Sequence, residues 1–368
     1  MRVLLSGTSN SVLAKSLNYS FNTDPAVTDF TNVSYGASGT VALGDHLRKV
    51  DFSQHDFCVL DYCVNEEVFI WQKDSSIDAA MNNLYAMIDA SAQAGCQPIV
   101  MIFPSSTRAN HKRPLEEAII DQLRARGIPV FNFYDFASRL TAQSGLDFKD
   151  LFLDPMHVRR EIGHFMGKTA VAYMKSVAAA GRPAPEASEL NYRPLSFVPF
   201  QEVTVSCSRQ IERRETKLAA AELLRITPGT RLDFAIKAPA EVIGMTYNAA
   251  RTIGKLSSPA APEETLMQVK PSGLFAKQRG LTLVTVPMTR PLSVPGDAAT
   301  LHYDFEGTVS DTQPSPALEL SGFVLRSLEQ SLPVHFCTHA SEPVILENSV
   351  SDTDLAALID TLTASPAA

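Results

Sequence analysis

The first 175 residues alternate between short apolar runs and longer segments of helical periodicity. The apolar runs predict buried strands at Val3–Ser6, Phe30–Tyr35, Phe57–Tyr62, Pro98–Phe103 and Pro129–Phe133. The periodic segments between them predict helices at Val12–Asn18, Gly44–Lys49, Ile77–Ala94, Leu115–Arg126, Tyr134–Ser144 and Arg160–Val177. Strands that alternate with helices at this spacing are typical of a parallel sheet covered on both faces. The pattern therefore predicts a doubly wound α/β/α domain over residues 1–180.

The second half of the chain has a different pattern of polar and apolar residues. Small residues and prolines follow the last predicted helix, and we interpret residues 181–194 as a linker. From residue 195 onward, short alternating runs separated by Pro and Gly predict strands at Glu202–Ser206, Arg231–Ile236, Leu281–Pro287, Ala299–Phe305 and Ala317–Leu325. One helix-like stretch, Arg213–Leu224, interrupts them, and an amphipathic helix is expected at Asp352–Thr363. Residues 195–368 therefore read as a β-sandwich or jelly-roll-like domain with a C-terminal helix.

Composition narrows the class of protein. The net charge of −8 argues against non-specific nucleic-acid binding. Five scattered cysteines show no paired metal-ligand spacing, so we expect free thiols and no metal or other cofactor. No apolar run resembles a signal-peptide core or approaches the length of a membrane span, which predicts a cytoplasmic location. The oligomeric state is left open.

The first predicted strand ends in the small and polar residues Ser6-Gly7-Thr8-Ser9-Asn10-Ser11. A serine between a strand and a helix lies at the carboxyl edge of the sheet, where open α/β folds place their sites. The helix start would bring free backbone N–H groups close to the Ser9 hydroxyl. On this stretch alone, simple capping of the helix by the serines explains the pattern better.

A second motif, Asp154-Pro155-Met156-His157, precedes the last helix of the α/β domain. With this spacing a short loop presents both side chains, and the carboxylate can orient the imidazole so that its other nitrogen accepts a proton. A serine alcohol needs such a base within hydrogen-bond reach to act as a nucleophile. Taken alone, Asp154 could equally cap the helix and His157 could be a surface residue.

Two further polar sites follow predicted strands. Gly36 and Gly39 lie in a glycine-containing turn after the second strand, where a backbone N–H can approach a ligand closely. Asn65 follows the third strand, and an amide there can donate to a developing negative charge. A plain turn and a loop residue bonded to its own backbone are the alternatives.

Together these elements resemble the SGNH (GDSL-type) hydrolase family over roughly the first 175 residues. Gly7-Thr8-Ser9 occupies the place of the family's nucleophile block, and Asp154 and His157 match its Asp-x-x-His block directly. The resemblance implies Ser9, Asp154 and His157 as a catalytic triad. It also implies an oxyanion hole of the Ser9 N–H, the Gly39 N–H (Gly36 being the other choice) and the Asn65 side chain.

The sequence departs from that family at two places. Thr8 replaces the usual aspartate of the first block, and Asn65 lacks its flanking Gly and Asp. The resemblance implies a serine esterase that removes acyl groups, acetyl among them, from a carbohydrate or related small ester. Two alternatives stay open: an O-acyltransferase in polysaccharide or glycolipid assembly, and a non-catalytic glycan-binding protein whose α/β domain has drifted.

Overall fold

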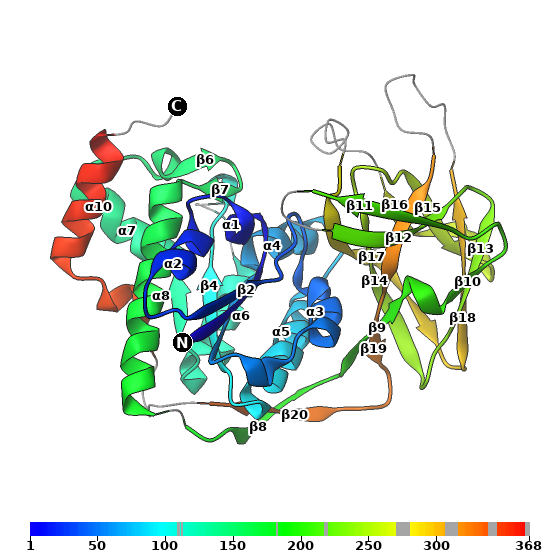
Figure 1. Cartoon of the computed structure of the whole chain (residues 1–368), viewed down its shortest axis with the longest axis horizontal. Coiled ribbons are helices and arrows are strands. Elements are labelled where there is room, and N and C mark those ends of the chain that lie inside the picture. Colours follow the sequence, from blue (N-terminus) through cyan, green and yellow to red (C-terminus); the bar gives the residue numbers. More distant parts are fainter. Residues whose placement is uncertain are drawn as a thin grey trace.

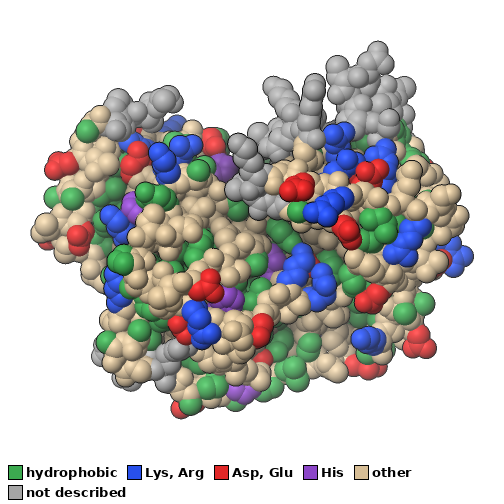
Figure 2. Space-filling view, viewed as in Figure 1, with side chains coloured by type: hydrophobic (Ala, Val, Ile, Leu, Met, Phe, Trp, Pro, Cys, Tyr) green, Lys and Arg blue, Asp and Glu red, His purple; other side chains and the backbone are tan. Residues whose placement is uncertain are grey.

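A computed structural model describes residues 1–108, 111, 113–181, 183–216, 220–269, 280–305, 316–337 and 344–364. Figure 1 shows two lobes side by side, a layered α/β lobe and a lobe built of strands, joined by a narrow two-stranded ribbon. The α/β and β-rich architecture predicted from the sequence is confirmed. Acidic and basic side chains are interspersed over the face in Figure 2, without a large area of one sign.

A five-stranded parallel sheet forms the centre of the α/β lobe. Its strands are β1 (Arg2–Gly7), β2 (Asp29–Asn32), β3 (Phe57–Asp61), β4 (Gln97–Ile102) and β5 (Val130–Asn132), in the order β2-β1-β3-β4-β5. All five predicted strands are present. Successive residues of β1 enter opposite cores, with Val3 and Leu5 in one and Leu4 in the other. Both faces are thus covered, which explains why β1, β3, β4 and β5 read as mainly apolar runs, whereas the edge strand β2 is partly exposed.

Helices cover each face of this sheet. One core is closed by α2 (Leu17–Thr23), α7 (Phe133–Ser144), α8 (Arg160–Ala180) and α10 (Asp352–Ala364), and the other by α3 (Leu43–Lys49), α5 (Ile77–Gln93) and α6 (Pro114–Gln122). Gly95 and Gly127 follow helical segments with φ of 73° and 79°, the left-handed conformation that glycine adopts at a helix end. The helix expected at Val12–Asn18 is instead split into α1 (Ser9–Val12) and α2, with Lys15 between them at φ 58°.

The sequence analysis missed one helix. Residues expected to form a loop after the third strand instead form α4 (Cys63–Gln72), which begins two residues after β3 ends. Its first two turns are buried, so the periodicity of a surface helix is absent there. Asn65 therefore lies in the first turn of a helix, and not on a loop.

The second lobe is a sandwich of two antiparallel sheets around one core. One sheet contains β10 (Val203–Val205), β13 (Thr230–Ala235), β18 (Ala298–Asp304), β15 (Gly254–Ser258) and β16 (Ala261–Val269) in that order. The other contains β11 (Gln210–Glu215), β12 (Ala220–Ile226), β19 (Leu318–Ser327), β14 (Ala240–Asn248) and β17 (Leu283–Val294), with β9 (Leu195–Pro199) also paired to β19. The helix expected at Arg213–Leu224 is wrong where the structure describes it: 213–215 belong to β11 and 220–224 to β12, which pair with each other, and 217–219 lie outside the described residues. Pairing of β12 with β19 and burial of Leu224 override its helical propensity.

The predicted linker over 181–194 and the predicted extent of the second domain both need correction. Residues Glu186–Tyr192 form β8, which pairs with β20 (Leu332–Phe336). This ribbon packs on the α/β lobe, because Tyr192, Val334 and Phe336 belong to its core. Helix α10 packs against α8 and α7 and therefore belongs to the α/β lobe, although the sequence analysis assigned it to residues 195–368. The β-sandwich is thus inserted between α8 and α10 (Figure 1).

A small apolar cluster also joins the two lobes. Val41 of the α/β lobe packs with Phe197, Ile243 and Val324 of the sandwich. The Arg48 guanidinium lies 5.1 Å from the centre of the Phe197 ring, a cation–π contact. These contacts fix the sandwich against the loop and helix that follow β2.

Candidate functional site

Ser9 lies where β1 turns sharply into α1. Gly7 ends the strand, and a Cβ built on it would come within 2.4 Å of Ser11 Oγ and 2.8 Å of Asp61 Cβ. Only glycine fits there without a shift of the chain. Thr8 and Ser11 are fully buried, whereas Ser9 is half-buried. The turn therefore leaves Ser9 accessible while its neighbours are held in the core.

The carboxylate of Asp61, at the end of β3, holds this turn. Its Oδ2 accepts hydrogen bonds from Thr8 N–H (3.3 Å), Thr8 Oγ1 (3.0 Å) and Ser11 Oγ (2.8 Å). Complete burial raises the pKa of Asp61 to about 6, although the bonds from Ser11 and Thr8 act to lower it. The sequence analysis did not select this residue.

Replacing Asp61 by asparagine should change the pH dependence of stability. The folded chain binds the Asp61 proton more tightly than the unfolded chain, so this carboxyl makes the free energy of unfolding fall as pH rises from about 4 to about 6. The difference in unfolding free energy between wild type and Asp61→Asn should shift by about 2 kcal/mol across that window, in favour of the variant at the higher pH. Urea titrations of both proteins at pH 4, 5, 6 and 7 measure it. A constant difference across the series would contradict the expectation.

The Asp154–His157 pair lies on a tight hairpin of β6 (Phe152–Asp154) and β7 (His157–Val158). His157 Nδ1 is 2.8 Å and 2.7 Å from the two carboxylate oxygens of Asp154. Partial burial acts to raise the pKa of Asp154, but hydrogen bonds from the Met156 N–H and from His157 lower it overall. An ionised carboxylate only accepts hydrogen bonds, so Nδ1 carries the proton and Nε2 is left as the basic nitrogen.

One side chain connects this hairpin to the Ser9 turn. Asn10 Nδ2 donates to the Met156 carbonyl oxygen (3.1 Å), and Asn10 Oδ1 accepts from the Val158 N–H (3.4 Å). The residue next to Ser9 thus binds the residues on both sides of His157. Figure 1 shows α1 and β7 together at one end of the α/β lobe. Asn10 is one of several polar residues in its stretch, and nothing in the local sequence distinguishes it.

The candidate oxyanion donors Gly36, Gly39 and Asn65 lie in different surroundings. A Cβ built on Gly36 would lie 3.9 Å from Ser9 Cβ, whereas one on Gly39 would meet Glu66 and Phe69 of α4. Asn65 is buried at the start of α4, and its Nδ2 donates to the Ser38 carbonyl oxygen (3.1 Å). These contacts favour Gly36 over Gly39 as the glycine next to the nucleophile.

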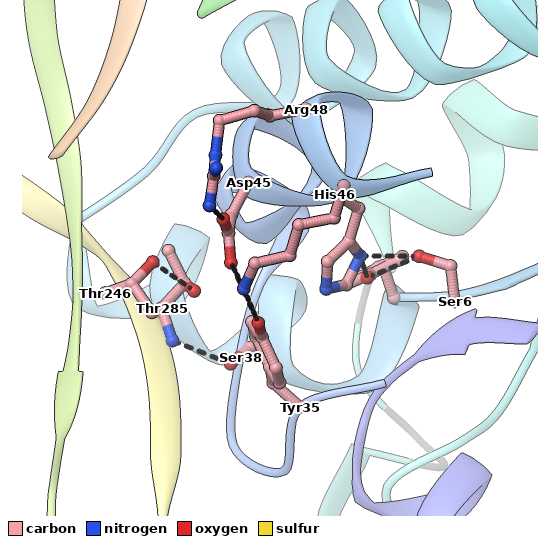
Figure 3. Close-up of polar contacts among 10 residues, drawn as sticks. Ser6, Tyr35, Ser38, Asp45, His46, Arg48, Thr246 and Thr285 are labelled. Atoms are coloured by element: carbon pink, nitrogen blue, oxygen red, sulfur yellow. Dashed lines mark hydrogen bonds and ion pairs between the residues drawn. The ribbon is translucent and has the colours of Figure 1, made fainter. Parts of the chain in front are cut away.

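A second serine–histidine pair lies deeper in the same lobe. Ser6 Oγ is 2.8 Å from His46 Nδ1 and 2.8 Å from the Tyr62 hydroxyl (Figure 3). Ser6 and His46 have no exposed surface, and burial lowers the pKa of His46 to about 4. This neutral, enclosed pair is a packing contact of the core.

No family model and no curated protein matches the sequence. Two solved structures match the fold over most of the chain. Both come from a two-domain esterase active on acetylated mannans. One has a TM-score of 0.60 and 10% sequence identity, covering 89% of this chain and 91% of that one. The other, co-crystallized with mannopentaose, has a TM-score of 0.59 and 11% identity over the same shares. The likeness extends across both lobes, beyond the first 175 residues to which the sequence resemblance was confined.

The described residues include neither a metal-binding cluster nor a helix able to cross a membrane. No cluster of three or more His, Cys, Asp or Glu side chains suited to a metal ion occurs among them. Within the same residues, no helix has both the length and the apolarity needed to cross a membrane.

Proposed function

We propose that the protein is a serine esterase of the SGNH type that removes acetyl groups from a carbohydrate. Ser9 is the nucleophile, His157 the general base, and Asp154 orients and stabilises the imidazole. The observation that supports this most directly is the pair of hydrogen bonds that Asn10 makes to the residues on either side of His157. They connect the serine turn to the histidine hairpin. The two-lobed likeness to an esterase active on acetylated mannans supports the choice of substrate class.

The proposed reaction uses the residues of this edge in two steps. His157 Nε2 takes the Ser9 proton while Ser9 Oγ attacks the ester carbonyl carbon. The Ser9 and Gly36 backbone N–H groups and the Asn65 side chain stabilise the oxyanion. The tetrahedral intermediate then expels the alcohol, which receives the proton from His157. A water, deprotonated by the same nitrogen, releases acetate and restores Ser9.

Hydrolysis of p-nitrophenyl acetate together with covalent labelling tests the proposal. We expect steady turnover, and one adduct per chain after treatment with a fluorophosphonate, located on Ser9 by peptide mass spectrometry. Acetate release from acetylated mannan should then exceed that from an acetylated protein control. Absence of both turnover and adduct, or an adduct on a different serine, would refute the proposal. Acetyl transfer to added mannopentaose in excess of hydrolysis would instead identify an O-acyltransferase that uses the same three residues.

A further inference from the structure

The loop from Gly36 to Thr40, here called the donor loop, lies between helix α4 and strand β17 of the sandwich. It carries Gly36, the glycine that faces Ser9. The inference below rests on the proposed function, because it concerns how that glycine is held.

Helix α4 binds the donor loop from one side. Asn65 Nδ2 donates to the Ser38 carbonyl oxygen, and Glu66 Oε2 accepts from the Thr40 N–H (2.7 Å) and Thr40 Oγ1 (3.0 Å). Glu66 is buried, and its other oxygen accepts from Ser75 Oγ (2.5 Å). These bonds fix the second half of the loop.

The sandwich binds the same loop from the other side. The Thr285 backbone N–H donates to Ser38 Oγ (2.8 Å), which joins residues 247 positions apart (Figure 3). The Ser38 side chain has no exposed surface, and Thr285 is likewise fully buried. A buried N–H left without an acceptor would cost more than the bond contributes, so this contact strongly determines where the loop lies.

Ser38 also reaches back to the glycine itself. Its hydroxyl donates to the Gly36 carbonyl oxygen (3.4 Å), so the single Ser38 Oγ links Gly36 to Thr285. Ala37, which lies between Gly36 and Ser38, has a φ of 56°, a left-handed conformation that is unfavourable for a residue with a Cβ. Ala37 packs against the sandwich core. Contacts with the second lobe therefore hold the loop in a conformation it would not favour alone.

We propose that the β-sandwich forms part of the catalytic apparatus by positioning the donor loop, with Ser38 as the positioning residue. Ser38 acts through Gly36 and does not contact the substrate. The Thr285 N–H fixes the Ser38 hydroxyl, and the hydroxyl fixes the Gly36 carbonyl and thereby the backbone of this residue beside Ser9. The second lobe thereby contributes to transition-state stabilisation in addition to any contact it makes with a glycan.

Ser38→Ala tests this role, with Thr246→Val as the matched control. Thr246, on the neighbouring strand β14, is fully buried and its Oγ1 shares a 2.8 Å hydrogen bond with Thr285 Oγ1, so Thr246→Val removes a buried hydroxyl beside Thr285 without touching the donor loop. We expect Ser38→Ala to lower kcat for p-nitrophenyl acetate by about 10- to 100-fold, as displaced catalytic groups do, with KM changed less than threefold. Thr246→Val should lower the melting temperature but leave kcat within about twofold of wild type.

Circular dichroism and thermal melting report the folded fraction of each variant, to which the rates are normalised. If Ser38→Ala does not fold, Ser38→Cys replaces it, because sulfur is a weaker acceptor of similar size and should give a smaller fall in kcat. Equal kcat for Ser38→Ala or Ser38→Cys and Thr246→Val would overturn the positioning role while leaving the esterase intact. Absence of hydrolysis in the wild type would overturn both.

Discussion

Ser9→Ala should abolish ester hydrolysis, while Ser6→Ala should leave it nearly unchanged. Both serines lie on or just after β1, and both have a histidine within the same lobe. Of the two, only Ser9 is accessible, and its neighbour Asn10 binds the hairpin whose histidine is hydrogen-bonded to a carboxylate. Loss of a nucleophile in a triad costs about 10⁴- to 10⁶-fold in kcat, because the base and the orienting carboxylate act only through it.

Steady-state turnover of p-nitrophenyl acetate by the two variants and the wild type measures this difference. Ser6→Ala removes a buried hydrogen bond to His46 and should cost about 1 kcal/mol of unfolding free energy. Its activity, corrected for the folded fraction, should stay within about twofold of wild type. The reverse pattern, with activity lost in Ser6→Ala and kept in Ser9→Ala, would show that the buried pair is the reactive one.

Glu347→Ala should lower the free energy of unfolding more than Ser6→Ala or Asp352→Asn does. Glu347 lies just before α10, where its Oε1 accepts from Arg124 Nη2 (2.5 Å) and its Oε2 from the Asn132 N–H (3.0 Å). The side chains of Glu347 and Arg124 are only 3% and 9% exposed, so truncation of Glu347 leaves Arg124 as a buried charge whose other carboxylate partner, Asp135, is 3.8 Å away. Breaking such a pair costs about 3–5 kcal/mol of unfolding free energy.

Chemical denaturation of three variants separates the pair from its surroundings. The double variant Arg124→Met with Glu347→Leu removes both charges and should recover most of the loss. Asp352→Asn breaks the exposed ion pair with Arg139, where the Asp352 side chain is 88% exposed, and should cost less than about 1 kcal/mol. Equal losses in Glu347→Ala and Asp352→Asn would contradict the argument from burial.

The features that the sequence predicts correctly are those encoded in local runs of residues. Four of the five parallel strands, β1, β3, β4 and β5, are predicted because burial on both faces makes each a mainly apolar run. The strands of the sandwich show a visible alternation of polar and apolar residues. Gly229, in the turn before β13, has a φ of 79°. The Asp154–His157 hydrogen bond follows from a spacing of three residues that a hairpin can close.

What the sequence does not predict depends on contacts between distant segments. Asn10 and Asp61 are recognisable as supports of the Ser9 turn only once β3 and the histidine hairpin are placed beside it. The sequence of β11 and β12 reads as a helix because β19, the strand that pairs with β12, lies almost a hundred residues further along the chain. The family resemblance favours Gly39 over Gly36, and only the positions of the Ser9 turn and of α4 show that Gly36 is the glycine near Ser9.

The insertion of the sandwich between α8 and α10 bears on how the chain folds as it is made. Helix α10 completes a core that β1 begins, since Leu355, Leu358 and Leu362 pack in the same cluster as Val3 and Leu5. A ribosome delivers residues in order, and domains generally fold as units once they emerge. The α/β core is therefore completed only after every strand of the sandwich has been synthesised, and the lobe encoded first closes last.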